Sequence, residues 1–344
     1  MGQVQVSFKK SIMKRFLAFL FFLTFVTLAH AVTVDENLVL FLSDFHCDVK
    51  PSVRYVSPVE TKRGPSMDFS YTPTGREGEF RVEYDTLANL RTWVSRIVAM
   101  DPRPAYVIML GDDINVPSED GYKLVKETLK PLDDAGIPYA KIMGNHDRPQ
   151  VAQQNDVYLR VFSEFGPRSI SPTKDWQAFR VSLKDVDFVL FETFDPLRGD
   201  WEKWFTPAQK EKYAENDGYL RYHGAFFPEQ VTWMESVLKA QPADRPIFFC
   251  GHHPTDVEAF FPQFKDFPQF QGWIHGHFHN FYRSKTDSPR SLSIPSAGVV
   301  GVGTFQTPPA IVKMQILPGA YRFTLWTLDE TDPLNGKEIV FEKQ

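Results

Sequence analysis

Residues 39–46 read Val-Leu-Phe-Leu-Ser-Asp-Phe-His, an apolar run that ends in a carboxylate and an imidazole. Apolar runs also cover residues 106–110, 139–143 and 247–249, and each of them leads into polar residues that can bind metal. These runs are too short for buried helices and are bounded by Gly, Pro or charge, so we predict that they form buried strands. The five polar clusters are Asp44-Phe45-His46, Gly111-Asp112, Gly144-Asn145-His146-Asp147, Gly251-His252 and Gly276-His277-Phe278-His279.

The spacing of the runs predicts how the clusters meet. Helical patterns cover about residues 84–100 and 118–134, so the beginning of the chain alternates strand, helix, strand, helix, strand. Such alternation predicts a layered α/β sheet. In open α/β sheets, ligands bind beyond the carboxyl ends of the strands, which is where the clusters would lie. We therefore expect them to converge in space.

The set of possible ligands favours a pair of metal ions over a single ion. Two carboxylates, one amide oxygen and four imidazoles exceed the four ligands of a closed zinc site, and the set contains no cysteine. Mixed nitrogen and oxygen ligation suits Mn, Fe, Zn or Co with positions left open for water. Two ions about 3.5 to 4 Å apart can bind the attacking and the leaving oxygen of an in-line displacement, so the set favours hydrolysis of a phosphate ester. The candidate ligands are Asp44, His46, Asp112, Asn145, His252, His277 and His279.

The ordered series D-x-H, G-D, G-N-H-D, G-H and G-H-x-H resembles the motifs of the calcineurin-like metallophosphoesterase family. It runs from Asp44 to His279, and it is specific as a set although a single D-x-H is not. The resemblance implies an α/β fold, a two-sheet αββα sandwich. It also implies two divalent or mixed-valence metal ions of the Mn, Fe or Zn class.

The resemblance further implies a role for each candidate ligand. One metal ion would be held by Asp44, His46 and His279. The other would be held by Asn145, His252 and His277. Asp112 would bridge the two ions, because the oxygens of a carboxylate offer several lone pairs. A water between two such cations loses a proton far more readily than bulk water and would attack phosphorus.

The resemblance implies that His146, which follows Asn145, donates a proton to the leaving group or hydrogen-bonds a phosphoryl oxygen. Histidine suits this role because its ordinary pKa lies close to neutral pH. Relatives orient this ring with a carboxylate three residues after the bridging aspartate, where this chain has Asn115. An amide orients a ring without stabilising its cation, and Asp113 or Asp147 could take over that task.

Structural roles compete with these functional ones. Asp44 and Asp112 could cap helices at strand-to-helix turns, although the surrounding set argues for ligation. His253 and His275 lie beside candidate ligands but outside the motif positions, so we interpret them as supporting or surface residues. His223 stands outside every cluster, and a lone histidine is most often structural.

Length and composition indicate one globular domain behind a leader. The chain has 344 residues with 42% hydrophobic content, enough for a sizeable core. Residues 1–31 read as a signal peptide, with basic residues before the apolar run 16–28 and cleavage after Ala31. The run is short of the roughly 20 residues of a spanning helix. We therefore expect a secreted or periplasmic domain over residues 32–344 without a stable membrane anchor.

The charge of the chain favours a small substrate. The net charge is −5 at pH 7, and loss of the four basic residues of the leader lowers it to −9. A protein that grips a nucleic-acid polymer is expected to carry a basic stripe. We therefore expect a small phosphoester, either a monoester or a diester, and leave the oligomeric state open. The alternatives are a hydrolase directed at nucleotides or nucleic acids and a catalytically silent protein that binds phosphorylated ligands.

Several further features are open at the level of sequence. Cys47 and Cys250 could form a disulfide in an exported protein, with buried free thiols as the default. Insertions are expected near residues 48–83, 195–226 and 255–271, and the first could fold over the site.

The aromatic run at 260–270 could form an apolar wall for a substrate or pack within a cap. Residues 227–235 indicate a helix that serves as scaffold. Residues 310–316 and 321–328 predict an antiparallel hairpin that closes the second sheet.

Overall fold

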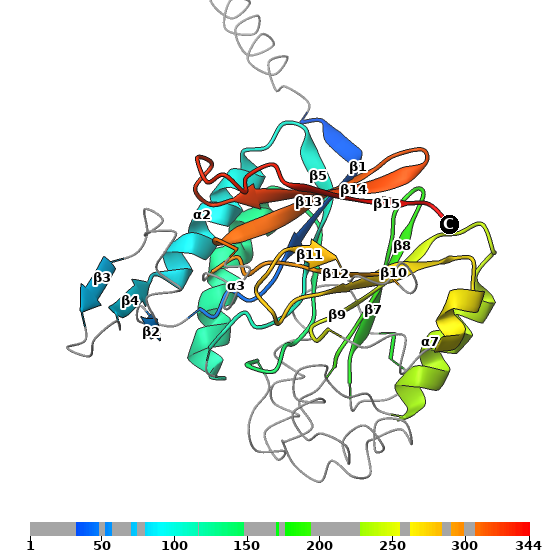
Figure 1. Cartoon of the computed structure of the whole chain (residues 1–344), viewed down its shortest axis with the longest axis horizontal. Helices are drawn as coiled ribbons and strands as arrows, with labels where there is room; N and C mark the ends of the chain where they lie inside the picture. Colours follow the sequence, from blue (N-terminus) through cyan, green and yellow to red (C-terminus); the bar gives the residue numbers. More distant parts are fainter. Residues whose placement is uncertain are drawn as a thin grey trace, which may run out of the picture.

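The structure is a computed structural model, and two six-stranded β-sheets form its centre (Figure 1). Residues 1–31, for which the sequence predicts a leader, lie outside the described residues, as do His223 and the expected insertion at 195–226. The described residues are 32–47, 52–56, 70–73, 80–115, 117–147, 170–171, 176–193, 228–254, 262–283, 290–298 and 307–344.

The first sheet has the order β15-β14-β13-β1-β5-β6. Its parallel part consists of β1 (Val34–Leu42), β5 (Arg103–Met109) and β6 (Tyr139–Lys141). Its antiparallel part consists of β13 (Ala310–Ile316), β14 (Ala320–Thr327) and β15 (Glu338–Glu342). β1 therefore lies in the middle of the sheet, where both faces are covered, and this explains why its second half, residues 38–42, is apolar and buried without alternation.

The second sheet has the order β11-β12-β10-β9-β8-β7. Its four central strands are parallel, and the strand at each edge is antiparallel to its neighbour. Because β9 and β10 are parallel neighbours, their carboxyl ends meet at one edge of the sheet. The strands are β7 (Ala178–Ser182), β8 (Asp187–Phe191), β9 (Ile247–Gly251), β10 (Phe270–His275), β11 (Tyr282–Arg283) and β12 (Ser291–Ser293).

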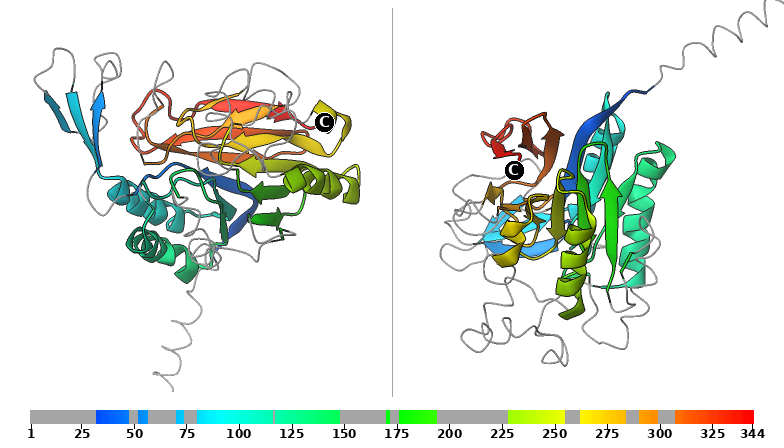
Figure 2. Two further views of the ribbon diagram at one scale, coloured as in Figure 1. Left: turned by 90° about the horizontal axis from the view of Figure 1, so that it is seen from below. Right: turned by 90° about the vertical axis from the view of Figure 1, so that its right-hand side faces the viewer.

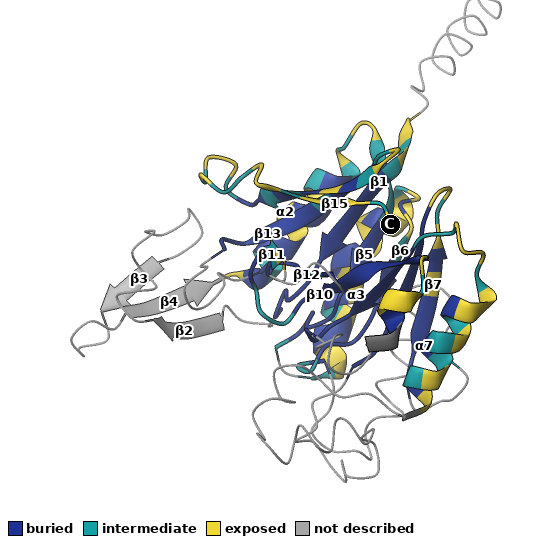
Figure 3. Cartoon of the chain, turned by 45° about the vertical axis from the view of Figure 1, so that its right-hand side comes forward, coloured by how far each residue is buried: buried dark blue, intermediate teal, exposed yellow. Residues whose placement is uncertain are grey.

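The two sheets pack face to face through an aromatic core. Phe41 of β1 lies 5.7 Å from Phe188 of β8, measured between ring centroids, and Phe248 of β9 lies 4.8 Å from Tyr321 of β14. The rings meet edge to face, the arrangement that aromatic quadrupoles favour. Figure 3 shows the central strands of both sheets as mostly buried. This core fixes the two sheets relative to each other.

Helices cover the outer faces of both sheets, as Figures 1 and 2 show. α2 (Thr86–Val98) and α3 (Glu119–Asp134) pack on the first sheet, and α7 (Pro228–Ala240) packs on the second. Asp85 and Ser118 cap the first two helices by accepting backbone N–H bonds from the first turn. The predicted αββα sandwich is therefore confirmed.

Two further features qualify the expectations from sequence. The hairpin of β13 and β14 forms as predicted, but it adds to β1 in the first sheet and does not extend the sheet of β8, β9 and β10. The insertion near 48–83 contains a separate three-stranded sheet of β2 (Ser52–Val56), β4 (Phe80–Tyr84) and β3 (Ser70–Pro73). Among the described residues, no helix has both the length and the apolar character to cross a bilayer.

The core between the sheets predicts a large loss of stability for Phe248→Ala. Phe248 is fully buried, and its removal leaves a cavity that rigid strands cannot fill, so we expect unfolding to be about 3–5 kcal/mol easier. Urea unfolding followed by circular dichroism measures this loss. Val340→Ala on β15 is the control, because that side chain is 38% exposed and its truncation should cost no more than about 0.5 kcal/mol. Equal losses for the two variants would contradict the described core.

Candidate metal centre

All seven candidate ligands lie at one edge of the sandwich, beyond the carboxyl ends of parallel strands. The sequence predicted this convergence, and the structure confirms that residues up to 235 positions apart come together there. Both sheets contribute, because β1, β5 and β6 belong to the first and β9 and β10 to the second. The ligands follow these strands in the order Asp44 and His46 (β1), Asp112 (β5), Asn145 (β6), His252 (β9), and His277 and His279 (β10).

The backbone of this edge adopts a conformation that L-residues rarely take. Among the described residues, every non-glycine residue with a positive φ is one of the candidate ligands. Such a conformation persists only when the surrounding structure enforces it, and it clusters at functional sites. The residues and their φ angles are Asp44 (54°), His46 (49°), Asp112 (56°), His277 (69°) and His279 (56°).

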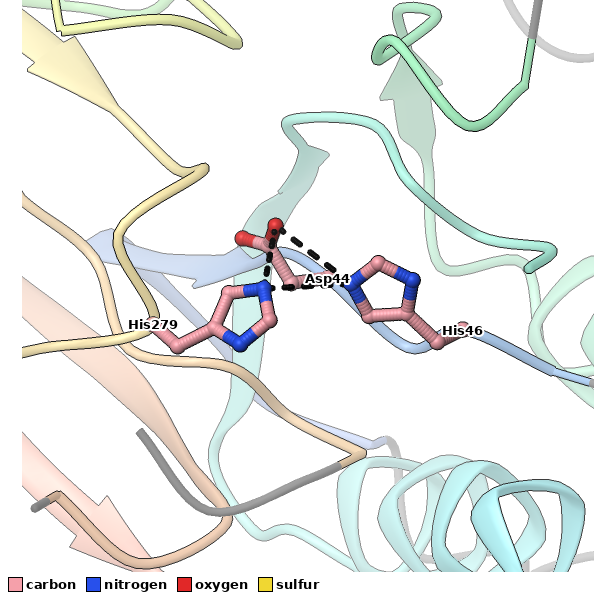
Figure 4. Close-up of side chains that lie close together, drawn as sticks. All are labelled: Asp44, His46 and His279. Atoms are coloured by element: carbon pink, nitrogen blue, oxygen red, sulfur yellow. Dashed lines mark hydrogen bonds and ion pairs between the residues drawn. The ribbon is translucent and has the colours of Figure 1, made fainter. Parts of the chain in front are cut away.

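The first group of ligands consists of Asp44, His46 and His279, which Figure 4 shows converging on one point. His279 Nε2 lies 3.2 Å from Asp44 Oδ1 and 3.1 Å from His46 Nε2. Asp44 is held in place by its neighbours, since the backbone N–H of His277 donates to both of its carboxylate oxygens. Two imidazole nitrogens and a carboxylate oxygen thus face a common centre.

The second group consists of Asp112, His252 and His277, together with Asn145. His252 Nε2 lies 3.1 Å from Asp112 Oδ2, and Asn145 Oδ1 lies 3.0 Å from both His252 Nε2 and His277 Nδ1. Asp112 Oδ2 is also 3.9 Å from His46 Nε2 of the first group. The two groups are therefore adjacent, with Asp112 between them.

The two groups fit cations of the class that the sequence predicted. Carboxylate, amide and imidazole donors suit Mn, Fe, Zn or Co. The ring of His252 is held by its other nitrogen, since Nδ1 lies 2.8 Å from the carbonyl oxygen of Leu110, which directs Nε2 toward Asp112. The glycines of the motifs permit this crowding, because a Cβ at Gly144 would lie 2.1 Å from Asp112 Oδ1 and one at Gly276 would lie 2.7 Å from Asp44 Oδ2.

In the absence of metal, burial and neighbouring charged side chains determine whether these groups are protonated. Burial lowers the pKa of both His46 and His277 to about 3. Burial also opposes a charge on His252, but the carboxylate of Asp112 outweighs it and raises the pKa of His252 to about 10. Burial would raise the pKa of Asp44, but nearby histidines hold it at about 2. Without metal, His46 and His277 are therefore neutral, and the positive charge of His252 offsets part of the negative charge of Asp44 and Asp112.

His146 is oriented in a way that the sequence did not reveal. Its Nδ1 lies 2.9 Å from the main-chain carbonyl oxygen of Asn115, and its backbone N–H donates to Asp112 Oδ1 over 2.7 Å. The two carboxylates that could have replaced the missing one have other partners. Asp147 accepts four backbone N–H bonds at 2.7–3.2 Å, and Asp113 pairs with Lys141. The carbonyl fixes the ring whatever side chain residue 115 carries.

Other supporting residues were missed or only partly predicted. Ser296, in the loop after β12, donates its hydroxyl hydrogen bond to the carbonyl oxygen of Asp44 over 2.6 Å. The small residues around it are a weak signal that a loop passes close to another backbone. His253 is buried, with Nδ1 2.6 Å from Thr193 Oγ1 and its ring 4.7 Å from that of His277. This position confirms its interpretation as a supporting residue.

Two open questions from the sequence are answered by burial. Phe264 and Phe270 are buried against Phe249 beneath α7, so these parts of the aromatic run pack as core and do not form a wall. Residues 260 and 261 of that run lie outside the described residues. Cys47 and Cys250 are buried free thiols, which was the default expectation.

The pKa shifts predict that the metal-free protein is most stable near pH 6.5. Below this value, the unfolded chain protonates His46 and His277, whereas the native protein protonates them only near pH 3. Stability should therefore fall with acid, less steeply than two protons alone would give, because burial raises the pKa of Asp147 to about 8 and the native protein keeps a proton there that the unfolded chain has lost. Above pH 6.5, only the native protein keeps the proton of His252, up to about pH 10, so stability should also fall with base.

Urea unfolding of chelator-treated protein from pH 4 to 9 tests this profile. His46→Asn is the matched variant, because it should remove one of the two protons from the acid slope while leaving the basic slope in place. A midpoint that does not change between pH 4 and 6.5 would contradict the buried, neutral state of these imidazoles.

Comparisons with known proteins agree with this geometry. The sequence model of the family described as calcineurin-like phosphoesterase matches residues 38–281. A probable glycerophosphodiester phosphodiesterase of Arcobacter nitrofigilis is 26% identical over 160 residues, which are 46% of this chain and 45% of that protein. A probable cyclic nucleotide phosphodiesterase of Rhodopseudomonas palustris is 24% identical over 170 residues, 49% of this chain and 50% of that protein. The chain therefore spans about half the length of these curated relatives.

Among solved structures, a dimetal phosphatase from Danio rerio shares the fold. The two match with a TM-score of 0.56 and 13% identity, over 89% of this chain and 99% of that chain. The family match covers more than half of the chain and includes every candidate ligand from Asp44 to His279. The protein belongs to the calcineurin-like phosphoesterase family.

Proposed function

We propose that the protein hydrolyses small phosphate esters with two metal ions held at the edge of the sandwich. The observation that carries this proposal is a chain of three overlapping groups with ligand atoms within 4.8 Å of one another in each group: Asp44, His46 and His279; His46, Asp112 and His146; and Asp112, His252 and His277. The first ion would be held by Asp44, His46 and His279. The second would be held by Asn145, His252 and His277. The left-handed backbone of five of these residues supports the proposal, because strain of this kind clusters at functional sites.

Two of the candidate ligands, Asp112 and Asn145, suit a centre with two metal ions. Asp112 Oδ2 lies 3.1 Å from His252 Nε2 and 3.9 Å from His46 Nε2, so a single carboxylate can serve both ions. Asn145 contributes a neutral oxygen, which keeps the net charge of the occupied centre positive. When bound, ions of the Mn, Fe or Zn class would supply Lewis acidity toward water and phosphoryl oxygens. The backbone bonds to Asp44 and Asp147 hold the ligand loops in place before any substrate arrives.

His146 would protonate the leaving group. Its ring lies 4.7 Å from that of His46, so it borders the first ligand group. With Nδ1–H donating to the carbonyl oxygen of Asn115, Nε2 remains as the nitrogen that can face a substrate. This nitrogen can donate a proton to an alkoxide as it departs from phosphorus. The leaving alcohol then carries the proton, and the ring is neutral at the end of the step.

The substrate class is a small phosphoester, and we propose diesters as the first class to test. The two curated relatives are named as probable phosphodiesterases, one for glycerophosphodiesters and one for cyclic nucleotides. The net charge of −5 supports a small substrate over a nucleic-acid polymer, because polymer binding relies on basic surfaces. Loops of different sequence can surround the same set of metal ligands on one fold, so the ligands alone do not determine the substrate.

Metal removal and restoration test the proposed function. After chelation, Mn²⁺, Zn²⁺ or Fe²⁺ is returned singly, and hydrolysis is compared on bis(p-nitrophenyl) phosphate, p-nitrophenyl phosphate and a panel of nucleotides. We expect no activity without metal, and restored activity, highest on a diester, when two ions are bound per chain. A chain that binds two ions and hydrolyses none of these compounds would support a phospho-ligand binding protein instead.

Substitution of His146 separates catalysis from metal binding. His146→Ala should lower kcat by about 10²- to 10⁴-fold, the usual contribution of a general acid, while elemental analysis still finds two ions per chain. Asn115→Ala is the matched control, because it keeps the main-chain carbonyl that orients the ring and should cost less than tenfold. Loss of a metal ion from His146→Ala would show that this residue is a ligand and not the proton donor.

A further inference from the structure

A lysine is buried directly behind the candidate metal centre. The side chain of Lys141, on β6, is fully buried, and its ammonium group contacts the carboxylate of Asp113, which is 1% exposed. The ammonium also lies 5.9 Å from the centre of the Tyr122 ring on α3. Removing an ammonium and a carboxylate from water is costly unless they pair, and such pairs often add little to stability. The presence of this pair in the interior therefore points to a role other than stabilisation alone.

The pair connects the two turns that carry Asp112 and Asn145 of the second ligand group. Asp113 directly follows Asp112 in the turn after β5, and Lys141 lies on the strand that leads into Asn145. β5 and β6 are parallel, with Met109 opposite Lys141. Because Lys141 comes four residues before Asn145, its contact with Asp113 fixes how far the first turn stands from the second.

A second link between the same turns depends on this arrangement. The carboxylate of Asp147 accepts backbone N–H bonds from Asp112 and Asp113 in one turn and from Gly144 in the other. The hydroxyl of Tyr122 donates to the carbonyl oxygen of Asp147. Asp112, Asp113 and Asp147 are thus three buried carboxyl groups in a small volume, and the ammonium group of Lys141 contacts that of Asp113.

The left-handed backbone of Asp112 needs this support. A non-glycine residue with a φ of 56° is strained and keeps that conformation only when its neighbours enforce it. The backbone N–H of Asp112 and the backbone N–H of Asp113 are both anchored on Asp147, while the side chain of Asp113 is anchored on Lys141. The carboxylate of Asp112 is thereby directed toward His252.

We propose that Lys141 is a positioning residue of the metal centre, which through Asp113 holds Asp112 and Asn145 at the spacing that the second ion requires. The proposal rests on the proposed function for its setting, since it concerns the same centre. Its consequence is that the second ligand group is formed before an ion binds. Residues that support metal ligands in this way typically change metal affinity by about 10- to 100-fold when removed.

The test replaces the pair by apolar side chains of similar shape, Asp113→Leu/Lys141→Met, a change that often leaves stability intact. Binding of Mn²⁺ and of Zn²⁺ to chelator-treated protein is followed by isothermal titration calorimetry. Amide hydrogen exchange of residues 112–114 is measured in the same metal-free samples. We expect two ions per chain in the wild type. In the variant, the affinity of the weaker of the two metal-binding steps should fall at least tenfold, and the amide hydrogens of residues 112–114 should exchange faster than in the wild type.

A matched control removes a buried ion pair elsewhere. Asp187, at the opposite end of β8 from the centre, pairs with Arg180 and Arg245. Asp187→Asn should lower the unfolding midpoint while leaving both binding steps and the exchange of residues 112–114 as in the wild type. An equal change of metal affinity in Asp187→Asn would attribute the effect to global destabilisation and overturn the proposal.

The single variant Lys141→Gln provides a second test, which holds even if the double variant does not fold. It keeps a hydrogen-bond donor near Asp113 but removes the charge, so we expect weaker binding of the second ion here too. Wild-type affinity for both ions and unchanged exchange in either folded variant would overturn the proposal. These measurements use no substrate, so a wild type that binds two ions but hydrolyses no phosphoester would refute the proposed function while leaving this inference standing.

Discussion

Carboxylates and imidazoles that share one buried space repel one another through their lone pairs unless a proton or a metal ion lies between them. The edge of this sandwich gathers such groups from five loops, and without metal a proton on His252 beside Asp112 provides part of the balance. The remaining structure holds these groups together against that repulsion. Left-handed residues, glycines at contact points and backbone hydrogen bonds to carboxylates all appear at this edge for that reason.

Both sheets are needed to hold the ligands together, because neither sheet contains a complete ligand group. Asp44, Asp112 and Asn145 follow strands of the first sheet, whereas His252 and His277 follow strands of the second. Their meeting point depends on the aromatic core that fixes one sheet against the other. Core packing is therefore linked directly to ligand geometry, since a small rotation between the sheets would separate the imidazoles from the carboxylates.

Much of this arrangement could be predicted from short patterns in the sequence. Apolar runs identified the strands, and the rule that ligands gather beyond the carboxyl ends of parallel strands predicted the convergence of Asp44 with residues more than two hundred positions away. Patterns of this kind are local, and they carry no information about which strand edge a hairpin joins. The hairpin of β13 and β14 was therefore recognised, but its pairing with β1 was not.

The contacts that support the ligands could not be predicted from the sequence, for a related reason. Asn115 orients His146 through its main-chain carbonyl, which every residue type possesses, so the sequence carries no signal for it. Lys141 lies within the run 139–143 that was predicted to be a buried strand, but only the fold brings it beside Asp113. The aromatic residues Phe264 and Phe270 could equally have lined a substrate site, and their burial against α7 is a property of tertiary packing.

The central claim is that one edge of the sandwich holds two neighbouring metal ions with Asp112 between them. A crystal structure of protein loaded with Mn²⁺ or Zn²⁺, with anomalous difference maps recorded at the absorption edge of the metal, tests this claim most directly. The account predicts two anomalous peaks about 3.5 to 4 Å apart, both within bonding distance of the carboxylate of Asp112. A single peak, or two peaks with no carboxylate between them, would contradict it.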